Sequence, residues 1–160
     1  MEFTLRRASE SDKERIEELF IEMLQSIYNE KVTDGYENGY LDRFFSGGDD
    51  WICVAESKGT VVGYISIEVH DKPEKFVYLD DLSVAGSFRN SGIGTALIER
   101  AESYAKQINA MYTALHIENS NKSALRLYER LGYRVYSSDK SRSFMQHDIA
   151  NGVKNDNNVS

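Results

Sequence analysis

The chain has 160 residues and a formal net charge of −7, with 41% hydrophobic and 28% charged residues. This composition is typical of one ordinary globular domain, and the acidic balance argues against a nucleic-acid partner, because such binding needs a basic face. No apolar run is long enough to cross a membrane, and the first residues lack the apolar core of a signal peptide. Because Cys53 is the single cysteine, we expect no internal disulfide and a cytoplasmic location.

The N-terminal half predicts a strand, two helices and a hairpin. Apolar residues recur at helical spacing after a capping box, which is formed either by Ser9 with Asp12 or by Ser11 with Glu14. A Lys-Gly pair supplies a tight turn between two β-rich runs. In chain order, we expect a strand at 2–7, helices at 10–29 and 34–46 (the second weaker), a turn at 47–50, and strands at 51–57 and 60–70.

The C-terminal half predicts strands that alternate with helices. In chain order, we expect a strand at 76–85, a helix at 92–108, a strand at 111–117, a short helix that Gly132 ends, and a final strand pair. This order predicts an α/β fold, with a mixed central sheet and helices on both faces, in a single domain at 1–149. Residues 150–160 have no apolar pattern and are expected to form a disordered tail.

The strand predicted at 76–85 breaks its alternation. Apolar residues occupy odd positions at Val77 and Leu79 but even positions at Leu82 and Val84. Because side chains alternate between the faces of a strand, the simplest explanation is a bulge near Asp80-Asp81. A strand buried on both faces would need no alternation, and this alternative stays open.

The stretch "RNSGIGT" at 89–95 links this strand to the next helix. A helix N-terminus offers unpaired N–H groups and partial positive charge, and glycine lets the backbone approach an anion closely. Two common phosphate motifs are excluded, because the third glycine of a dinucleotide motif would fall at Leu97 and no G-K-S/T sequence is present. The loop therefore indicates a different phosphate ligand.

Here the sequence resembles the GCN5-related N-acetyltransferase (GNAT) family. Residues 89–94 match the family's Q/R-x-x-G-x-G/A motif, and residues 121–133 match N-x-x-A-x-x-L-Y-E-x-x-G-F/Y. The resemblance extends over residues 2–148, and the family's polyamine acetyltransferases have an acidic stretch similar to "YLDDLSV". Two positions depart from the pattern, since Gly86 stands where proline is frequent and Asn90 where glycine is frequent.

The resemblance implies that acetyl-coenzyme A is the cosubstrate. The loop would hold the pyrophosphate, and the bulged strand would pair with the pantetheine arm and stabilise the oxyanion through a backbone N–H. The amine would attack directly in a ternary complex. Contacts with acetyl-coenzyme A are expected from Leu82, Ser83, Val84, Arg89, Asn90, Ser91, Gly92, Ile93, Gly94, Thr95, Asn121 and Tyr128.

Such a transfer benefits from a base and an acid. An alkyl amine has a pKa near 10.4, so only about one molecule in a few thousand is neutral at pH 7. Asp80 and Asp81 are the candidate bases, and Glu68 is third. The resemblance implies Tyr128 as the proton donor to the leaving thiolate, although Tyr128 also lies on the apolar stripe of its helix. Asn121 is equally suited to cap that helix.

The segment between residues 26 and 45 mixes aromatic and acidic side chains, which together suit a cation. We expect the acceptor to contact Tyr28, Tyr36 and Asp80, and to be a small amine or polyamine. The alternative, that the aromatic residues are core and the acidic ones solvated, stays open.

Other functions also stay open: a non-catalytic acyl-coenzyme A sensor, a peptide or protein N-acetyltransferase, and a nucleotide-binding regulator. The family often dimerises, so a homodimer is a further candidate. Cys53 lies in an apolar run and is expected to be buried. We expect no metal, because His70, His116 and His147 share no metal-ligand spacing.

Overall fold

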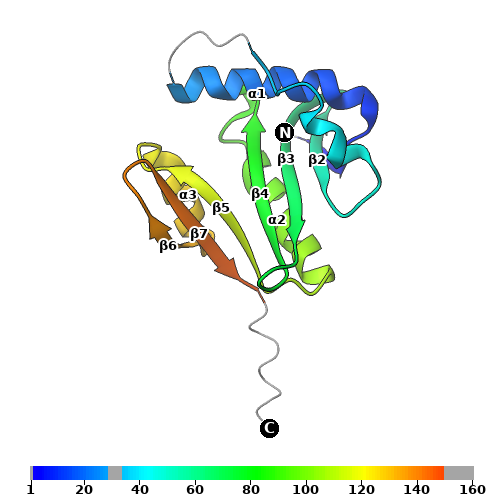
Figure 1. The fold of residues 1–160 in the computed structure, drawn as a ribbon. Helices are drawn as coiled ribbons and strands as arrows, with labels where there is room; N and C mark the ends of the chain where they lie inside the picture. Colours follow the sequence, from blue (N-terminus) through cyan, green and yellow to red (C-terminus); the bar gives the residue numbers. More distant parts are fainter. Residues whose placement is uncertain (1, 29–33, 150–160) are drawn as a thin grey trace. The chain divides into compact units, whose positions relative to one another are not determined.

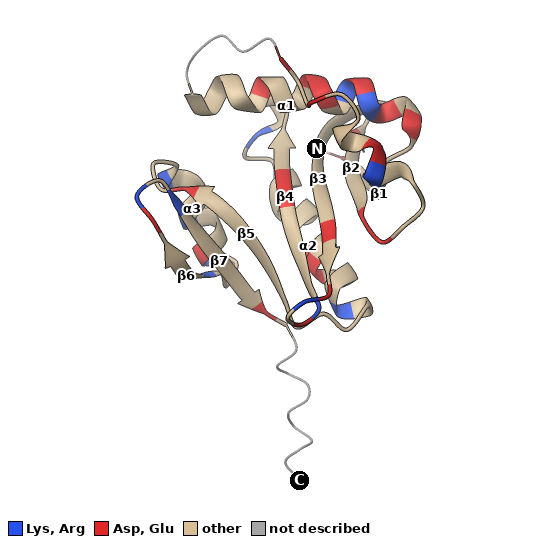
Figure 2. Cartoon of the chain, viewed as in Figure 1, with Lys and Arg blue, Asp and Glu red and all other residues tan. Residues whose placement is uncertain are grey.

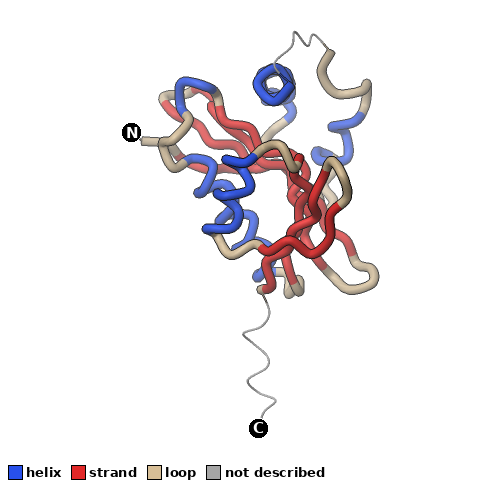
Figure 3. Tube along the Cα trace, turned by 90° about the vertical axis from the view of Figure 1, so that its left-hand side faces the viewer, coloured by secondary structure: helices blue, strands red, loops and turns tan. Residues whose placement is uncertain are grey.

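The structure is a computed structural model that describes residues 2–28 and 34–149. It divides into two compact units: among the described residues, unit 1 comprises 2–28, 34–68 and 81–101, and unit 2 comprises 69–80 and 102–149. Figure 3 shows the helices and strands along the chain. The predicted tail at 150–160 lies outside the described residues, and the domain boundary at residue 149 stays a prediction.

Unit 1 consists of an antiparallel sheet with helices on both of its faces (Figure 1). The predicted hairpin is confirmed, and Lys58 and Gly59 form its turn with φ of 51° and 80°. The elements that lie in this unit or begin in it are β1 (Thr4–Arg7), η1 (Glu10–Asp12), α1 (Lys13–Tyr28), η2 (Tyr40–Phe45), β2 (Trp51–Ser57), β3 (Thr60–His70), η3 (Gly86–Phe88) and α2 (Ile93–Gln107).

The core of unit 1 follows from strand alternation. Ile52 and Val54 of β2 point to the side of α1, where they join a buried cluster with Ile16 and Leu19. Trp51 points to the opposite side, where Arg100 of α2 lies 5.3 Å from its ring. This arrangement confirms the expected helices on both faces.

The helix predicted at 34–46 is wrong in its extent. Only Tyr40–Phe45 is helical, and it is a 3-10 helix. Gly39, which precedes it, has a φ of +85°, a left-handed conformation through which a right-handed helix does not continue. Leu41 and Phe44 are nevertheless buried in the core.

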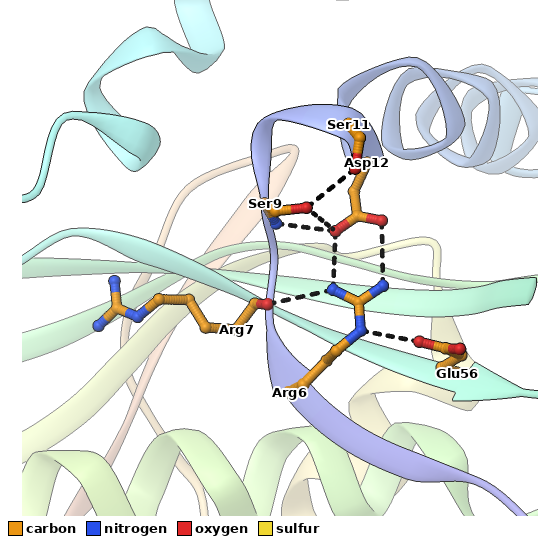
Figure 4. Close-up of polar contacts among 6 residues, drawn as sticks. All are labelled: Arg6, Arg7, Ser9, Ser11, Asp12 and Glu56. Atoms are coloured by element: carbon orange, nitrogen blue, oxygen red, sulfur yellow. Dashed lines mark hydrogen bonds and ion pairs between the residues drawn. The ribbon is translucent and has the colours of Figure 1, made fainter. Parts of the chain in front are cut away.

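The capping box at the start of the first helical segment is the Ser9 and Asp12 pair (Figure 4). The Ser9 N–H donates to Asp12 Oδ2 over 2.8 Å. Arg6 binds both oxygens of this carboxylate, at 2.8 and 3.1 Å, and also donates to Glu56 over 2.7 Å. The Arg6 hydrogen bonds lower the pKa of Asp12 below its usual range. The ionised carboxylate therefore ties β1 to the start of α1.

Replacement of Asp12 by alanine is expected to lower the free energy of unfolding by about 2 kcal/mol, because a helix cap and charge-assisted hydrogen bonds are lost. In a chain of this size that is a fall in Tm of roughly 4–8 °C. Because the pKa of Asp12 is depressed in the folded state, this stabilisation is present at neutral pH and is lost as the pH falls below about 4.

The matched control is Asp42→Ala. Asp42 is exposed and pairs with Lys13 at 3.2 Å, so its removal is expected to change stability by less than about 1 kcal/mol. Thermal unfolding followed by circular dichroism at pH 7 and pH 3 compares the two variants. Equal Tm values for the two variants at pH 7 would show that Asp12 has no special role.

Unit 2 combines parallel and antiparallel strand pairs. β4 (Phe76–Val84) belongs to this unit as far as Asp80, and pairs in parallel with β5 (Tyr112–Glu118) over Phe76–Tyr78. β7 (Arg142–Asp148) pairs antiparallel with both β5 and β6 (Arg134–Ser138). Together with α3 (Lys122–Arg130), these strands confirm the predicted mixed α/β fold. The described strands follow the order β1-β2-β3-β4-β5-β7-β6.

Burial keeps one phase along β4: Val77, Leu79 and Ser83 are buried, all at odd positions. Even-numbered Phe76 stacks on His70, and Tyr78 contacts His116. The bulge near Asp80-Asp81 stays a prediction. Across residues 2–28 and 34–149, we find no helix with the length and apolar character that a membrane span needs.

Candidate functional site

The glycine loop of unit 1 has the backbone of an anion-binding turn. Asn90 and Gly92 both adopt left-handed conformations, with φ of 62° and 90°, and α2 begins at the next residue, Ile93. A β-carbon at Gly92 would meet nothing within 4 Å. The first N–H groups of a helix have no partner within it, which makes the start of α2 a candidate anion-binding site.

Arg89 lies beside this loop with an oriented guanidinium group. Its Nε donates to the Val84 carbonyl over 3.1 Å, and its Nη1 lies 3.5 Å from Ser26 Oγ of α1. The side chain is exposed, so further N–H donors can reach a phosphate in solvent. Ser91 turns inward instead and donates through its hydroxyl to the Phe88 carbonyl.

The structure explains both departures from the family pattern. Asn90 occupies a left-handed position, which suits glycine best and which asparagine tolerates better than most residues. The Gly86 N–H donates to Glu22 Oε2 of α1 over 2.8 Å. Proline has no N–H and could not make this bond. Glycine at position 86 therefore allows a hydrogen bond to α1, where proline would instead make the turn more rigid.

Gly86→Pro is therefore expected to destabilise this chain by about 1 kcal/mol, a fall in Tm of roughly 2–4 °C, despite the rigidity that proline adds. Gly86→Ala keeps the N–H and is the control. Its β-carbon would lie 3.1 Å from Glu22 Oε2, at the end of a flexible side chain, so we expect little change. Thermal unfolding measures both variants, and a stabilised proline variant would contradict the role of Glu22.

The strand segment before the loop is closely packed. Ser83 is buried and its hydroxyl donates to the Leu19 carbonyl over 2.9 Å. A β-carbon at Gly63 of β3 would lie 3.1 Å from the Ser83 carbonyl oxygen and 3.2 Å from Ile93 Cγ2. Sequence reasoning missed Gly63, although a glycine inside a strand is itself a signal of close approach.

Two of the predicted acceptor and base residues meet in unit 1. The Tyr36 hydroxyl donates to Asp81 Oδ2 over 2.7 Å and lies 2.8 Å from the hydroxyl of Tyr64. Tyr64 is fully buried and was not predicted; a tyrosine inside an otherwise apolar strand was its only signal. Tyr28 is exposed near the end of α1, and the half-buried Asp80 belongs to unit 2.

Glu68, the third candidate base, is already paired. Figure 2 shows acidic residues on both β3 and β4, and the Glu68 carboxylate of β3 binds the Arg43 guanidinium. Arg43 also lies 5.2 Å from the Tyr40 ring and 4.6 Å from the Phe44 ring. The cation over these two rings is therefore a side chain of the protein, and Phe44 is buried in the core as the alternative interpretation expected.

Unit 2 holds the predicted acid and the asparagine. Tyr128 is 7% exposed, and its ring packs edge-on against Tyr133 at 5.4 Å. Burial, and secondly the charge of Glu102, raise the pKa of Tyr128 above its usual value. Asn121 caps α3, with its Oδ1 accepting from the Ala124 N–H over 3.3 Å. Both residues thus have structural roles in unit 2.

Cys53 is buried, and His116 and His147 each lie close to a polar side chain of unit 2. Cys53 is fully buried, and burial raises the pKa of its thiol to about 11. His116 Nδ1 lies 2.7 Å from the Tyr78 hydroxyl, and His147 Nδ1 lies 3.0 Å from Glu102 Oε2. The described residues contain no group of three or more potential metal ligands.

Known proteins resemble this chain in sequence and in fold. It is 33% identical over 133 residues to an uncharacterized N-acetyltransferase of Methanocaldococcus jannaschii, covering 81% of this chain and 77% of that protein. It is 26% identical to the N-alpha-acetyltransferase daf-31 of Caenorhabditis elegans, covering 81% and 80%. The PaiA N-acetyltransferase of Thermoplasma acidophilum, solved with coenzyme A, has the same fold with a TM-score of 0.77, at 19% identity and 93% and 100% coverage.

The sequence model of the acetyltransferase (GNAT) family matches residues 14–133, which include the glycine loop and the helix that carries Tyr128. The match covers most of the chain and spans both units. The chain therefore belongs to the GNAT acetyltransferase family, and it is an N-acetyltransferase whose cosubstrate is acetyl-coenzyme A.

Proposed function

We propose that the protein transfers the acetyl group of acetyl-coenzyme A to the primary amine of a small molecule, by direct attack in a ternary complex. The observation that carries this proposal is the loop at 89–94, where Asn90 and Gly92 open the N-terminus of α2 to an anion. The backbone of Leu82, Ser83 and Val84 pairs with the pantetheine arm, and one of its N–H groups stabilises the oxyanion.

The pyrophosphate of acetyl-coenzyme A binds where the loop and α2 present several N–H groups. The hydrogen-bond donors are charge-neutral amides and one exposed guanidinium, which suit a doubly charged ligand. The residues assigned to this contact are Arg89, Asn90, Ser91, Gly92, Ile93, Gly94 and Thr95, and Asn121 and Tyr128 contact the pantetheine arm.

On the acceptor side, a carboxylate of β4 removes the proton that the amine must lose. Asp81 is better supported than Asp80, because the hydrogen bond from Tyr36 fixes its position. Glu68 is less suited, since the Arg43 guanidinium already binds its carboxylate.

The acid is assigned to Tyr128. Its raised pKa keeps the hydroxyl protonated at neutral pH, so it can donate a hydrogen bond to the departing sulfur. A thiol has a pKa near 8.5, well below that of this tyrosine, so the hydrogen bond stabilises the thiolate without complete proton transfer.

The acceptor is a small amine or polyamine, which Tyr28, Tyr36 and Asp80 contact. The α-amino group of a peptide is the second candidate, because the C. elegans relative is named an N-alpha-acetyltransferase. A cytoplasmic location and a homodimer stay predictions, as does the absence of a nucleic-acid partner.

An assay of free thiol release with acetyl-coenzyme A tests the proposal. The panel contains monoamines, diamines, polyamines and peptides with free N-termini. The protein adds little background, because the thiol of Cys53 is buried and protonated at neutral pH. Amine-dependent thiol release supports the enzyme. A thermal shift with coenzyme A but no turnover with any amine would indicate the non-catalytic sensor, and stabilisation by ATP alone would indicate the nucleotide-binding regulator.

A further inference from the structure

Two side chains of α1 reach the segment 86–89, which leads into the glycine loop. The Glu22 carboxylate accepts a hydrogen bond from the Gly86 N–H over 2.8 Å, and the Ser26 hydroxyl lies 3.5 Å from Arg89 Nη1. Residues four positions apart in a helix lie on the same face, so one face of α1 makes both contacts. All four residues belong to unit 1.

The strand that precedes this segment is also fixed to its surroundings, but by buried contacts. The buried Ser83 hydroxyl donates to the Leu19 carbonyl of α1 over 2.9 Å, and the Ala85 N–H donates to a carbonyl of β3 over 2.8 Å. Beyond Ala85 the chain turns to the surface, and of residues 86–90 all but Phe88 are exposed. The side chains of α1 therefore hold the backbone at the point where buried packing ends.

The contact with Ser26 gives the Arg89 guanidinium a second fixed point. Its Nε donates to the Val84 carbonyl over 3.1 Å, and its Nη1 is directed to Ser26. Because a guanidinium group is planar and its five N–H donors have a fixed arrangement, two contacts set the direction of the remaining donors. The donors that are to meet a phosphate are thus oriented by α1 as well as by the strand.

Glu22 brings a negative charge to a segment that leads into a proposed anion site. Two negative charges repel, so electrostatics alone would disfavour a carboxylate at this position. Its hydrogen bond to the Gly86 N–H supplies a reason of another kind, since it fixes the backbone of an exposed turn. The two effects on anion binding have opposite signs, so removal of the Glu22 side chain separates them.

We propose that Glu22 and Ser26 are positioning residues, which act through Gly86 and Arg89 to hold the glycine loop in the conformation that binds the pyrophosphate of acetyl-coenzyme A. This inference rests on the proposed role of the loop and assigns its conformation to a helix that lies more than 60 positions away in the sequence. Without these contacts the loop populates other conformations, and the apparent dissociation constant rises as the binding-competent fraction falls.

Isothermal titration calorimetry with acetyl-coenzyme A tests the proposal. Glu22→Ala is expected to raise the dissociation constant about fivefold, the loss of one hydrogen bond, although it removes a negative charge. Glu22→Gln keeps an oxygen that accepts from the Gly86 N–H and is expected to bind at least as tightly as the wild type. Ser26→Ala is expected to raise the dissociation constant about twofold, and Ser26→Thr, which keeps the hydroxyl, to restore it.

Glu18→Ala is the matched control. Glu18 lies one turn earlier on α1 and pairs with Arg15 at 3.0 Å, so the variant removes an equal charge from the same helix. Its affinity for acetyl-coenzyme A is expected to be unchanged or slightly higher. Equal or tighter binding in Glu22→Ala would overturn the proposal, because that is the result of removing the charge alone.

Steady-state kinetics of thiol release separates positioning from simple structural support. Glu22→Ala is expected to raise the KM for acetyl-coenzyme A and to leave kcat and the KM for the amine within about twofold, because the contact acts on the donor site. Glu22→Gln should restore the KM. A lower Tm in Glu22→Ala with unchanged affinity and KM would assign Glu22 to structural support only and overturn the proposal.

Because calorimetry needs no acceptor, this proposal and the proposed function fail separately. Weakened binding in Glu22→Ala and its rescue in Glu22→Gln, in a protein that acetylates no small amine, would remove the proposed function and leave the positioning role. Amine-dependent thiol release by a protein whose affinity for acetyl-coenzyme A does not depend on Glu22 would remove the positioning role and leave acetyl transfer.

Discussion

Gly92→Val is expected to weaken the binding of acetyl-coenzyme A by about 100-fold, or about 2.7 kcal/mol. Gly92 has a φ of 90°, where a β-branched residue is strained, and the space above it is where the pyrophosphate is proposed to bind. The valine either fills this space or moves the loop. Isothermal titration calorimetry with acetyl-coenzyme A measures the change.

Gly47→Val separates loss of affinity from strain. Gly47 has a φ of 88°, and a β-carbon there would also meet nothing within 4 Å, but it lies in the turn before β2. The two variants are expected to lose similar stability, and only Gly92→Val should lose affinity. If acetyl-coenzyme A binds within about threefold of the wild-type affinity in Gly92→Val, the loop does not hold the pyrophosphate.

Tyr128→Phe is expected to lower kcat by about 100-fold, the lower end of what a positioned proton donor contributes. The substitution keeps the aromatic ring, which packs against Tyr133, and removes only the hydroxyl. Binding of acetyl-coenzyme A and the KM for the amine should therefore change little. Steady-state kinetics by thiol release, with calorimetry of the binary complex, distinguish the two effects.

Tyr133→Phe is the matched control, because Tyr133 is also buried in unit 2 and its hydroxyl reaches Thr113 rather than a proposed ligand. It should lower Tm and leave kcat within about twofold. Equal kcat values for the two variants would assign Tyr128 to the core, the role that its burial and position on the helix also allow.

The regular elements of the chain were well predicted where the signals are local. Strands 51–57 and 60–70 match β2 and β3 to the residue, because their β-rich runs are bounded by a two-residue turn. The segment 34–46 was not well predicted, since the left-handed conformation of Gly39 limits the helix to Tyr40–Phe45.

The glycine loop illustrates how far local sequence reaches. Its motif predicted the family, which the family match confirms, and it identified Gly86 and Asn90 as unusual positions. Their reasons are structural: Asn90 needs a positive φ, and Gly86 needs an N–H for Glu22, which is 64 residues away. The positive φ of Asn90 is a local property and could have been predicted. The contact of Gly86 with a residue distant in sequence could not.

The sequence by itself determined the family and the order of elements, because sequence motifs and hydrophobic periodicity depend on neighbouring residues. Only the tertiary structure decided which partner each carboxylate has. Glu68 pairs with Arg43, 25 positions away, and Asp81 with Tyr36, 45 positions away. Periodicity states which face a side chain occupies, but not which of the many polar groups it meets there.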